Sequence, residues 1–225
     1  MISAIIVAGG RGERLSANIP KQFLEVYGKP IILRAVESVW SCTRVSEMIV
    51  VVPEAYKERA EQVLAGKEVK VVIGGAERQD SVWAGLQQIS TQSRLVMIHD
   101  GVRPFASKQM IERVVEAAER SGAAIPCQAI KETIKEIDPK TGKVVCTVDR
   151  KTLCAVQTPQ VFTRALIMES HQRAQDLGFY ATDDAGLVEW LGREVAIVEG
   201  EETNLKITTP LDLKLAGIIA RDLEK

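Results

Sequence analysis

The sequence predicts an α/β protein built around a mostly parallel β-sheet with helices on both faces. Short apolar runs alternate with helical patterns along most of the 225 residues, which is typical of βαβ units. The apolar runs are nearly continuous, as expected for strands buried on both faces. A polar, β-rich stretch breaks this alternation after residue 130 and predicts a protruding β-hairpin arm. These features describe a Rossmann-like fold in a single domain, residues 1–225, with the arm at about 131–153.

Six short apolar runs are the predicted strands. They span residues 2–7, 48–52, 69–73, 95–98, 123–127 and 194–198. Runs of this length, bounded by helical patterns or turn residues, are typical of buried strands. Because helices connect most of them, the crossovers are expected to be right-handed.

Helical patterns fill the intervals between the strands and the end of the chain. They cover residues 30–41, 54–65, 79–89, 108–120, 164–178, 182–192 and 208–225. Pro30 suits the first position of the first helix, while Gly122 and Gly178 stand where two others should end. Thr182 and Thr209 are the predicted N-caps of the last two helices.

The arm corresponds to ETIKEIDPKTGKVVCTVD, residues 132–149, with two β-rich stretches around the turn DPKTGK. Much of it is polar, so it cannot lie at the centre of a buried sheet. Its apolar residues Ile137, Val144 and Val145 leave two alternatives open. They pack on another subunit, or the hairpin forms an edge on the same subunit.

The composition limits the classes of partner. A formal net charge of −1 argues against a general nucleic-acid binder. No apolar run approaches the roughly 18 residues that cross a bilayer, and the N-terminal apolar run ends too early for a signal peptide. The four cysteines are widely spaced without a CxxC pair, which favours reduced thiols over disulfides or zinc. With two histidines, a histidine-rich metal site is excluded. We therefore expect a cytoplasmic protein with no nucleic-acid or membrane partner.

The stretch AGGRGERLSANIPKQ, residues 8–22, follows the first predicted strand. It lacks the GxxxxGK[ST] run of a P-loop. In GRGERL, Leu15 stands where a dinucleotide fingerprint requires glycine or alanine. About twenty residues separate Gly9 from Pro30, whereas βα connections usually have 2–6. A loop of this length in a compact α/β domain is usually functional.

The composition of this loop favours phosphate binding. Gly9, Gly10 and Gly12 let the backbone approach a ligand with its N–H groups directed at phosphate, and Arg14 and Lys21 add positive charge. Glycines and charges coincide at the carboxyl end of a strand, where α/β sheets bind ligands. The alternative is that these charges are a solvated surface.

The segment AIIVAGGRGERLSANIPKQFLEVYGKPIILR resembles the signature loop of nucleotidyltransferases that activate sugar and polyol phosphates. Within it, PKQF resembles the cytidylyltransferase branch. A resemblance to the 2-C-methyl-D-erythritol 4-phosphate cytidylyltransferases continues through GGAERQDSVWAGL, HDGVRPF, TVDRKTL, QTPQVF, TDDAGLVE and NLKITTPLDL, in that family's order and spacing. It implies transfer of CMP from CTP to methylerythritol phosphate, with release of pyrophosphate, in non-mevalonate isoprenoid precursor synthesis.

The resemblance implies that basic residues carry the reaction. An ionised phosphate must approach a triphosphate, so the enzyme must neutralise and align charge, and no strong general base is required. The implied catalytic residues are Arg14, Lys21, Arg150 and Lys206. Of these, Arg14 and Lys21 stabilise the α-phosphate, while Arg150 and Lys206 grip the acceptor phosphate.

Further residues are implied to bind substrate. They are Ala8, Gly9, Gly10, Gly75, Ala76, Ser81, Asp100, Arg103 and Thr133. Position alone leaves Ser81 open as a helix cap and Asp100 open as a cap on the turn that follows it. Asp100 ends a buried strand, where an open sheet binds ligand. Thr133 lies in the arm and resembles a residue contributed across a homodimer.

A nucleoside triphosphate implies Mg²⁺, which keeps several waters and binds phosphates plus one or two carboxylates. Since the sequence shows no dense carboxylate cluster, CTP is expected to carry most of the ion. Asp183 and Asp184 form an adjacent pair, but the electrostatics of a helix start explains them. No protein ligand to the metal is therefore predicted.

Three other functions are alternatives to this one. Ribitol 5-phosphate cytidylyltransferase would share the same loop chemistry with a similar acceptor. An NAD-dependent oxidoreductase is disfavoured by Leu15 and by the length of the loop. A non-catalytic nucleotide-binding protein is disfavoured by the presence of both Arg14 and Lys21.

Overall fold

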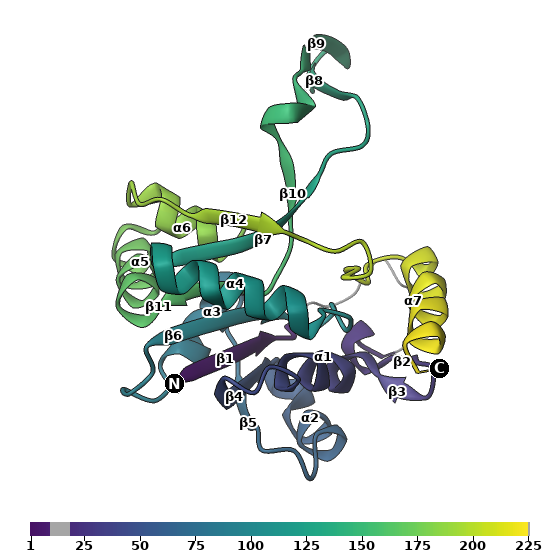
Figure 1. The fold of residues 1–225 in the computed structure, drawn as a ribbon, viewed down its shortest axis with the longest axis vertical. Coiled ribbons are helices and arrows are strands. Elements are labelled where there is room, and N and C mark those ends of the chain that lie inside the picture. The colour runs from purple at the N-terminus through teal and green to yellow at the C-terminus, as the bar shows by residue number, and fades with distance from the viewer. Residues whose placement is uncertain (10–18, 225) are drawn as a thin grey trace.

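The computed structural model describes residues 1–9 and 19–224. Within them an eight-stranded sheet has the order β10-β7-β11-β6-β1-β4-β5, and β12 also pairs with β7 (Figure 1). The strands are β1 (Ile2–Val7), β4 (Val45–Val52), β5 (Lys70–Ile73), β6 (Leu95–Asp100), β7 (Ala123–Ala129), β10 (Cys154–Val156), β11 (Gln160–Thr163) and β12 (Ala196–Glu199).

The sheet is mostly parallel, as predicted. Strands β5, β4, β1 and β6 run parallel, and so do β7 and β12. Strand β11 lies antiparallel between β6 and β7, and β10 lies antiparallel to β7. The sequence analysis did not predict β10 and β11, which reverse the sheet direction.

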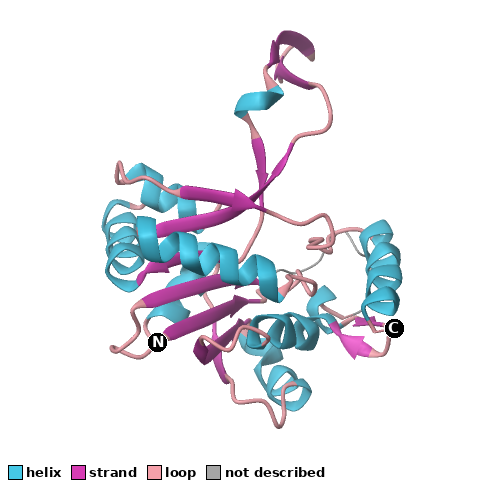
Figure 2. Cartoon of the chain, viewed as in Figure 1, coloured by secondary structure: helices cyan, strands magenta, loops and turns pink. Residues whose placement is uncertain are grey.

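Helices cover both faces of the sheet (Figure 2). They are α1 (Ile31–Trp40), α2 (Lys57–Val63), α3 (Arg78–Leu86), α4 (Lys108–Ser121), α5 (Arg164–Leu177), α6 (Asp184–Trp190) and α7 (Pro210–Leu223). Short 3-10 turns occur at η2 (Lys21–Phe23), η3 (Glu54–Tyr56) and η4 (Arg150–Thr152), and a small hairpin is formed by β2 (Glu25–Val26) and β3 (Lys29–Pro30). None of the helices in the described part of the chain combines the length and apolarity that a membrane span requires.

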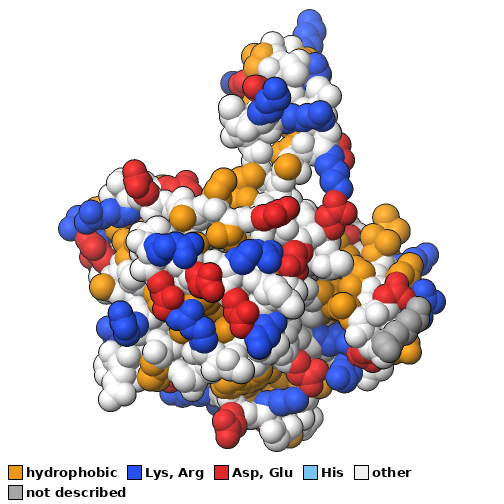
Figure 3. Space-filling model, viewed as in Figure 1, with side chains coloured by type: hydrophobic (Ala, Val, Ile, Leu, Met, Phe, Trp, Pro, Cys, Tyr) orange, Lys and Arg blue, Asp and Glu red, His pale blue; other side chains and the backbone are white. Residues whose placement is uncertain are grey.

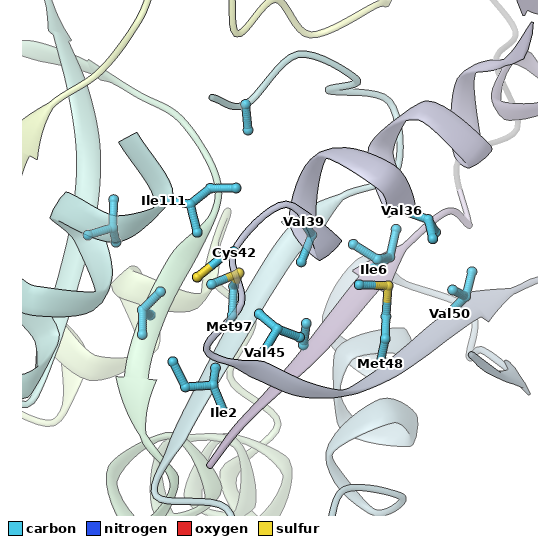
Figure 4. Packing of buried hydrophobic residues seen from close by; sticks show 14 of the residues in the cluster. Ile2, Ile6, Val36, Val39, Cys42, Val45, Met48, Val50, Met97 and Ile111 are labelled. Atoms are coloured by element: carbon cyan, nitrogen blue, oxygen red, sulfur yellow. The ribbon is translucent and has the colours of Figure 1, made fainter. Parts of the chain in front are cut away.

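The alternation of side chains along β1 divides the core into two layers. Ile2, Ala4 and Ile6 pack into a cluster that includes residues of α1, α2 and α4. Ile5 and Val7 point the other way, into a cluster with residues of α3, α5 and α6. Because neighbouring strand residues point to opposite faces, one continuous apolar run serves both layers. Figure 4 shows the first layer, in which side chains from the helix above meet those of the strands.

The helix boundaries confirm most predicted end signals. Gly122 and Gly178 adopt the left-handed conformation after α4 and α5, which glycine adopts at little cost. Thr209 caps α7, and Asp212 completes a capping box with it.

Two predicted helix-start residues were wrong. Pro30 precedes α1 with an extended ψ of 140° because it still pairs with Glu25 in the β2–β3 hairpin. The N-cap of α6 is Asp183 rather than Thr182, since the Asp183 carboxylate accepts a hydrogen bond from Gly186 N at 3.0 Å.

Strands β8 (Ile134–Asp138) and β9 (Lys143–Val148) pair as a separate antiparallel hairpin. It stands away from the main sheet at the top of Figure 1. Ile137, Val144 and Val145 are each 58–60% exposed on it. The chain leaves for the hairpin from β7 and returns on β10, where Ala129 and Cys154 are register partners.

Acidic and basic side chains are interspersed over the face of the molecule in Figure 3. No large area of one sign of charge covers that face, in keeping with a net charge of −1. Such a surface does not create the long-range field that a basic nucleic-acid-binding face produces.

Candidate active site

A cavity of about 540 Å³ opens at the carboxyl ends of the parallel strands. It is lined by Val7, Ala8, Gly9, Lys21, Gln22, Gly75, Ala76, Glu77, Arg78, Ser81, Asp100, Val102 and Lys206. Val7 is in register with Val51 on one side and with Asp100 on the other. Backbone hydrogen bonds of 2.8 Å, from Ala8 N to Val51 O and from Gly101 N to Val7 O, extend this floor. The cavity therefore lies where open α/β sheets bind ligands.

The segment after β5 approaches α3 so closely that it requires glycine. A Cβ on Gly75 would stand 2.3 Å from the Cβ of Asp80, and one on Gly74 would stand 2.5 Å from Ser81 Oγ. Asp80 belongs to the capping box of α3 with Glu77 as N-cap, whereas Ser81 lies inside the helix and donates to Glu77 O. The positive end of α3 is thereby directed toward the cavity, where it favours an anion.

Gln22 anchors the turn that carries Lys21. Its side chain is 1% exposed, and Nε2 donates to Ala8 O at 2.8 Å. The bond joins η2 to the end of β1 and keeps Lys21 beside the cavity floor. Gln22 Oε1 is buried without a hydrogen-bond partner among the described residues. Gln22 is the third residue of the motif PKQF that carries the resemblance, but no site role was predicted for it.

Asp100 is surrounded by three cationic side chains. Lys206 Nζ lies 2.9 Å from its Oδ2, Arg78 Nε lies 3.4 Å from its Oδ1, and Arg103 Nε lies 3.5 Å from its Oδ2. Burial by itself would raise the pKa of Asp100, but Arg78 and Lys206 hold it well below its usual range. The carboxylate is therefore ionised, and its partners are the cationic side chains rather than the backbone of the following turn.

His99 supports Asp100 from behind through a chain of hydrogen bonds. Its Nε2 lies 2.8 Å from Arg103 O, and because a carbonyl only accepts, Nε2 carries the proton. Nδ1 then accepts from Thr158 Oγ1 at 3.0 Å. The same oxygen accepts from Asp100 N at 3.0 Å. This chain fixes one neutral tautomer of His99.

The burial of His99 predicts a pH dependence of stability. Burial lowers the pKa of His99 from 6.5 to about 4, against smaller opposing effects of Arg103 O and Asp100. Between these two pKa values the unfolded chain binds more protons than the folded chain. Neutral His99 therefore contributes to the free energy of unfolding in full above pH 6.5, and this contribution is lost as pH falls toward 4. We expect it to be on the order of 3 kcal/mol.

Urea denaturation of the wild type and of His99→Gln at intervals from pH 7 to pH 4 measures this contribution. The fall in unfolding free energy across this range should be smaller in the variant by about the same amount. Equal falls in both proteins would contradict the prediction.

The sequence-predicted site residues divide into four groups. Those that line the cavity are Ala8, Gly9, Lys21, Gly75, Ala76, Ser81, Asp100 and Lys206. Arg103 is buried behind Asp100 and donates to Asn204 O at 2.8 Å. Thr133 and Arg150 are exposed in the segment between β7 and β10, away from the cavity lining of their own chain. The predictions for Gly10 and Arg14 lie outside the described residues.

The cavity also contains residues that the sequence analysis did not single out, chiefly Gln22, Glu77 and Arg78. Arg78 stands in the quoted motif GGAERQDSVWAGL as a charged residue at a helix start, which is ordinarily a surface position. Its contact with Asp184, at 2.8 Å between Nη1 and Oδ2, joins segments far apart in the sequence. Asp184 is fully buried, so the electrostatics of a helix start does not account for it.

The carboxylates present suit a magnesium ion carried by a ligand better than one held by the protein. No group of three or more His, Cys, Asp or Glu residues able to hold a metal occurs in residues 1–9 and 19–224. Glu77 and Asp100 line the cavity, and Asp100 already faces three cations. One or two carboxylates beside bound phosphates are the usual protein contribution for Mg²⁺.

The chain is similar to one family of known proteins along nearly its whole length. The sequence profile of the IspD family, described as 2-C-methyl-D-erythritol 4-phosphate cytidylyltransferase, matches residues 2–222. A protein of that name from Geobacillus kaustophilus is 44% identical over 220 residues, which cover 96% of this chain and 95% of the relative.

Two solved structures have the fold of this chain. The 4-diphosphocytidyl-2C-methyl-D-erythritol synthase of Anaerococcus prevotii has a TM-score of 0.87 and 32% identity, over 98% of each chain. The 2-C-methyl-D-erythritol 4-phosphate cytidylyltransferase of Thermus thermophilus has a TM-score of 0.83 and 37% identity, over 98% of this chain and all of the other.

The fold and the site are those of a nucleotidyltransferase, with Lys21 beside a cavity at the carboxyl edge of the sheet. Within that class the match extends along nearly the whole chain. The chain belongs to the 2-C-methyl-D-erythritol 4-phosphate cytidylyltransferase family.

Proposed function

We propose that the protein transfers CMP from CTP to 2-C-methyl-D-erythritol 4-phosphate in isoprenoid precursor synthesis. The products are 4-diphosphocytidyl-2-C-methyl-D-erythritol and pyrophosphate. The observation that carries the proposal is the family match over residues 2–222. It is supported by a cavity in which Lys21, Asp100 and Lys206 converge with a helix N-terminus.

In the proposed reaction an oxygen of the acceptor phosphate attacks the α-phosphorus of CTP. A new P–O bond forms, the bond to the bridging oxygen of the β-phosphate breaks, and pyrophosphate leaves with that oxygen. The acceptor phosphate is already ionised near neutral pH, so the protein need not remove a proton. Its task is to align two anions and to stabilise the charge that builds on the α-phosphoryl oxygens.

Each part of the site has a role in this scheme. The segments containing Gly9 and Gly75 approach the nucleotide through their backbones, together with Ala8, Gly10, Ala76 and Ser81. Lys21, with Arg14, stabilises the α-phosphate. Lys206 holds the acceptor phosphate with Arg103 behind it, and Arg150, which lies away from the cavity of its own chain, would join them from a second subunit. Asp100 accepts hydrogen bonds from hydroxyl groups of the acceptor. Magnesium, carried mainly by the CTP phosphates, supplies further neutralisation of their charge.

We further propose that the chain forms one nucleotidyltransferase domain, residues 1–225, and assembles as a homodimer through the arm at about 131–153. The apolar residues Ile137, Val144 and Val145 remain exposed on the single chain, and a second copy would cover them. The dimer would bring Thr133 of one subunit to the cavity of the other. A cytoplasmic location is supported by four free cysteines, as expected in a reducing compartment.

Pyrophosphate release with CTP and magnesium tests the function. Methylerythritol phosphate and ribitol 5-phosphate are supplied separately, and a reaction without acceptor measures CTP hydrolysis. We expect kcat/KM for methylerythritol phosphate to exceed that for ribitol 5-phosphate by at least roughly tenfold. Release with ribitol 5-phosphate alone would overturn the acceptor and keep the reaction class. A folded protein that binds CTP but releases no pyrophosphate with either acceptor would contradict the proposed catalysis.

A further inference from the structure

Four charged side chains alternate in sign from the core to the cavity. Asp184 contacts Arg78 at 2.8 Å between Oδ2 and Nη1, Arg78 contacts Asp100 at 3.4 Å, and Asp100 contacts Lys206 at 2.9 Å. We call Asp184, Arg78, Asp100 and Lys206 the charge ladder. Side-chain exposure is 1% at Asp184, 30% at Arg78, 9% at Asp100 and 43% at Lys206, so the ladder connects a buried anion with a cation at the cavity.

The buried end of the ladder is held on both sides. Asp184 Oδ1 lies 3.0 Å from Nε2 of His171, which is completely buried on α5. The His171 ring is stacked on Trp83 of α3 with a centroid distance of 6.2 Å. Helices α3, α5 and α6 therefore meet at this carboxylate, and its position is determined by packing as well as by charge.

Helix capping does not account for Asp184. Its neighbour Asp183 already caps α6. A buried ion pair is weak evidence for stability, because desolvation of the charges offsets much of their attraction. Burial would raise the pKa of Asp184, but Arg78 and His171 hold it below its usual value, so the residue is a retained buried charge.

Arg78 joins the two carboxylates with one guanidinium group. Nε donates to Asp100 Oδ1 at 3.4 Å, while Nη1 forms an ion pair with Asp184 Oδ2, which accepts no hydrogen bond among the described residues. The planar group holds these nitrogens in a fixed arrangement. If the Asp184 charge were removed, Arg78 would lose the contact that orients it. The Asp100 carboxylate would then change its orientation, and the ammonium group of Lys206, which pairs with it, would move as well.

We propose that Asp184 and Arg78 are positioning residues that set the location of Lys206 through Asp100. This inference rests on the proposed function, in which Asp100 and Lys206 contact the acceptor. Loss of the Asp184 charge would weaken acceptor binding and slow transfer. CTP binding through Gly75, Ala76 and Ser81 would stay largely unchanged.

Asp184→Asn tests the ladder, because it removes the charge and keeps the size of the side chain. Asp183→Ala is the matched control, since it removes the cap of the same helix without touching Arg78. With rates normalised to folded protein, Asp184→Asn should raise KM for methylerythritol phosphate about tenfold and lower kcat by a similar factor. The Kd for CTP alone, measured by calorimetry, should change less than about twofold. If Asp184→Asn matched Asp183→Ala in these constants, or weakened CTP as much as the acceptor, the proposal would fail.

A double-mutant cycle with Lys206→Met locates the effect. Residues that act through one another are not additive, so Asp184→Asn should change the residual rate less than about twofold when Lys206 is already replaced. Multiplicative losses in the double variant would show that Asp184 does not act through Lys206.

A readout that does not need substrate separates this inference from the proposed function. Brief acetylation with acetic anhydride, followed by mass spectrometry, measures the reactivity of Lys206 in the full chain. Reactivity should rise severalfold in Asp184→Asn and stay at the wild-type value in Asp183→Ala. An unchanged value in both would overturn the ladder even in an active enzyme. A wild type inactive with methylerythritol phosphate would count against the proposed function and not against the ladder, which the reactivity of Lys206 tests independently.

Discussion

Replacing Lys21 by alanine is expected to lower kcat by about 10²–10³, the effect of losing one preorganised contact to a developing oxyanion. Lys21 lines the cavity on a turn that Gln22 ties to Ala8. The turn that carries Lys21 is therefore held in place before charge develops on the α-phosphate. Steady-state pyrophosphate release with saturating CTP and acceptor measures the loss, because a contact that strengthens in the transition state acts on kcat.

Lys29→Ala is the control for Lys21→Ala. Lys29 forms an exposed ion pair with Glu37 at 3.2 Å, away from the cavity, and such pairs contribute about 0–1 kcal/mol to stability. Its kcat should stay within about twofold of the wild-type value. If kcat fell less than tenfold in Lys21→Ala, or fell equally in the two variants, Lys21 would not be a residue that stabilises the transition state.

Phe162→Ala is expected to lower the free energy of unfolding by about 3–5 kcal/mol, the usual cost of deleting a buried aromatic ring. Phe162 has no exposed surface and lies on β11, in register with Val96 of β6 and Ala123 of β7. The ring belongs to the layer that includes residues of α3, α5 and α6. Its removal leaves a cavity that close-packed neighbours only partly fill.

Equilibrium unfolding in urea measures this loss, and Leu177→Ala is the comparison. Leu177 is 70% exposed at the end of α5, so its truncation should cost within about 0.5 kcal/mol. Similar midpoints for the two variants would mean that the strand inserted between β6 and β7 is not a part of the cooperative core.

The strands that the sequence predicts well are those with both faces buried. In ISAIIV the apolar run, in which Ser3 is the one polar residue, is enough to identify β1, because the two core layers each take alternate side chains. Strands β10 and β11 escaped prediction for a physical reason. They have three and four residues and are not separated by a helix, so neither periodicity nor alternation distinguishes them from a loop. The α6 cap was misplaced by one residue because Thr182 and Asp183 are both good caps.

The site was predictable where one local segment determines it. Lys21 and Asp100, which line the cavity, both stand in the sequence close after a predicted strand or at its end, where α/β sheets bind ligands. Arg78 and Asp184 were not predictable as partners, since each has an ordinary local explanation at a helix start. Only the packing of α3 against α5 and α6 brings their charges together. Arg150 and Thr133 stay predictions of the resemblance.

The register between Ala129 and Cys154 has a topological consequence. The chain leaves the sheet and re-enters it at adjacent points, so everything between β7 and β10 is an insertion whose length the sheet does not constrain. Insertions between paired ends change little in the fold that carries them. Evolution could therefore lengthen, shorten or resurface this segment, and thereby alter assembly, while the catalytic scaffold keeps its hydrogen bonding intact.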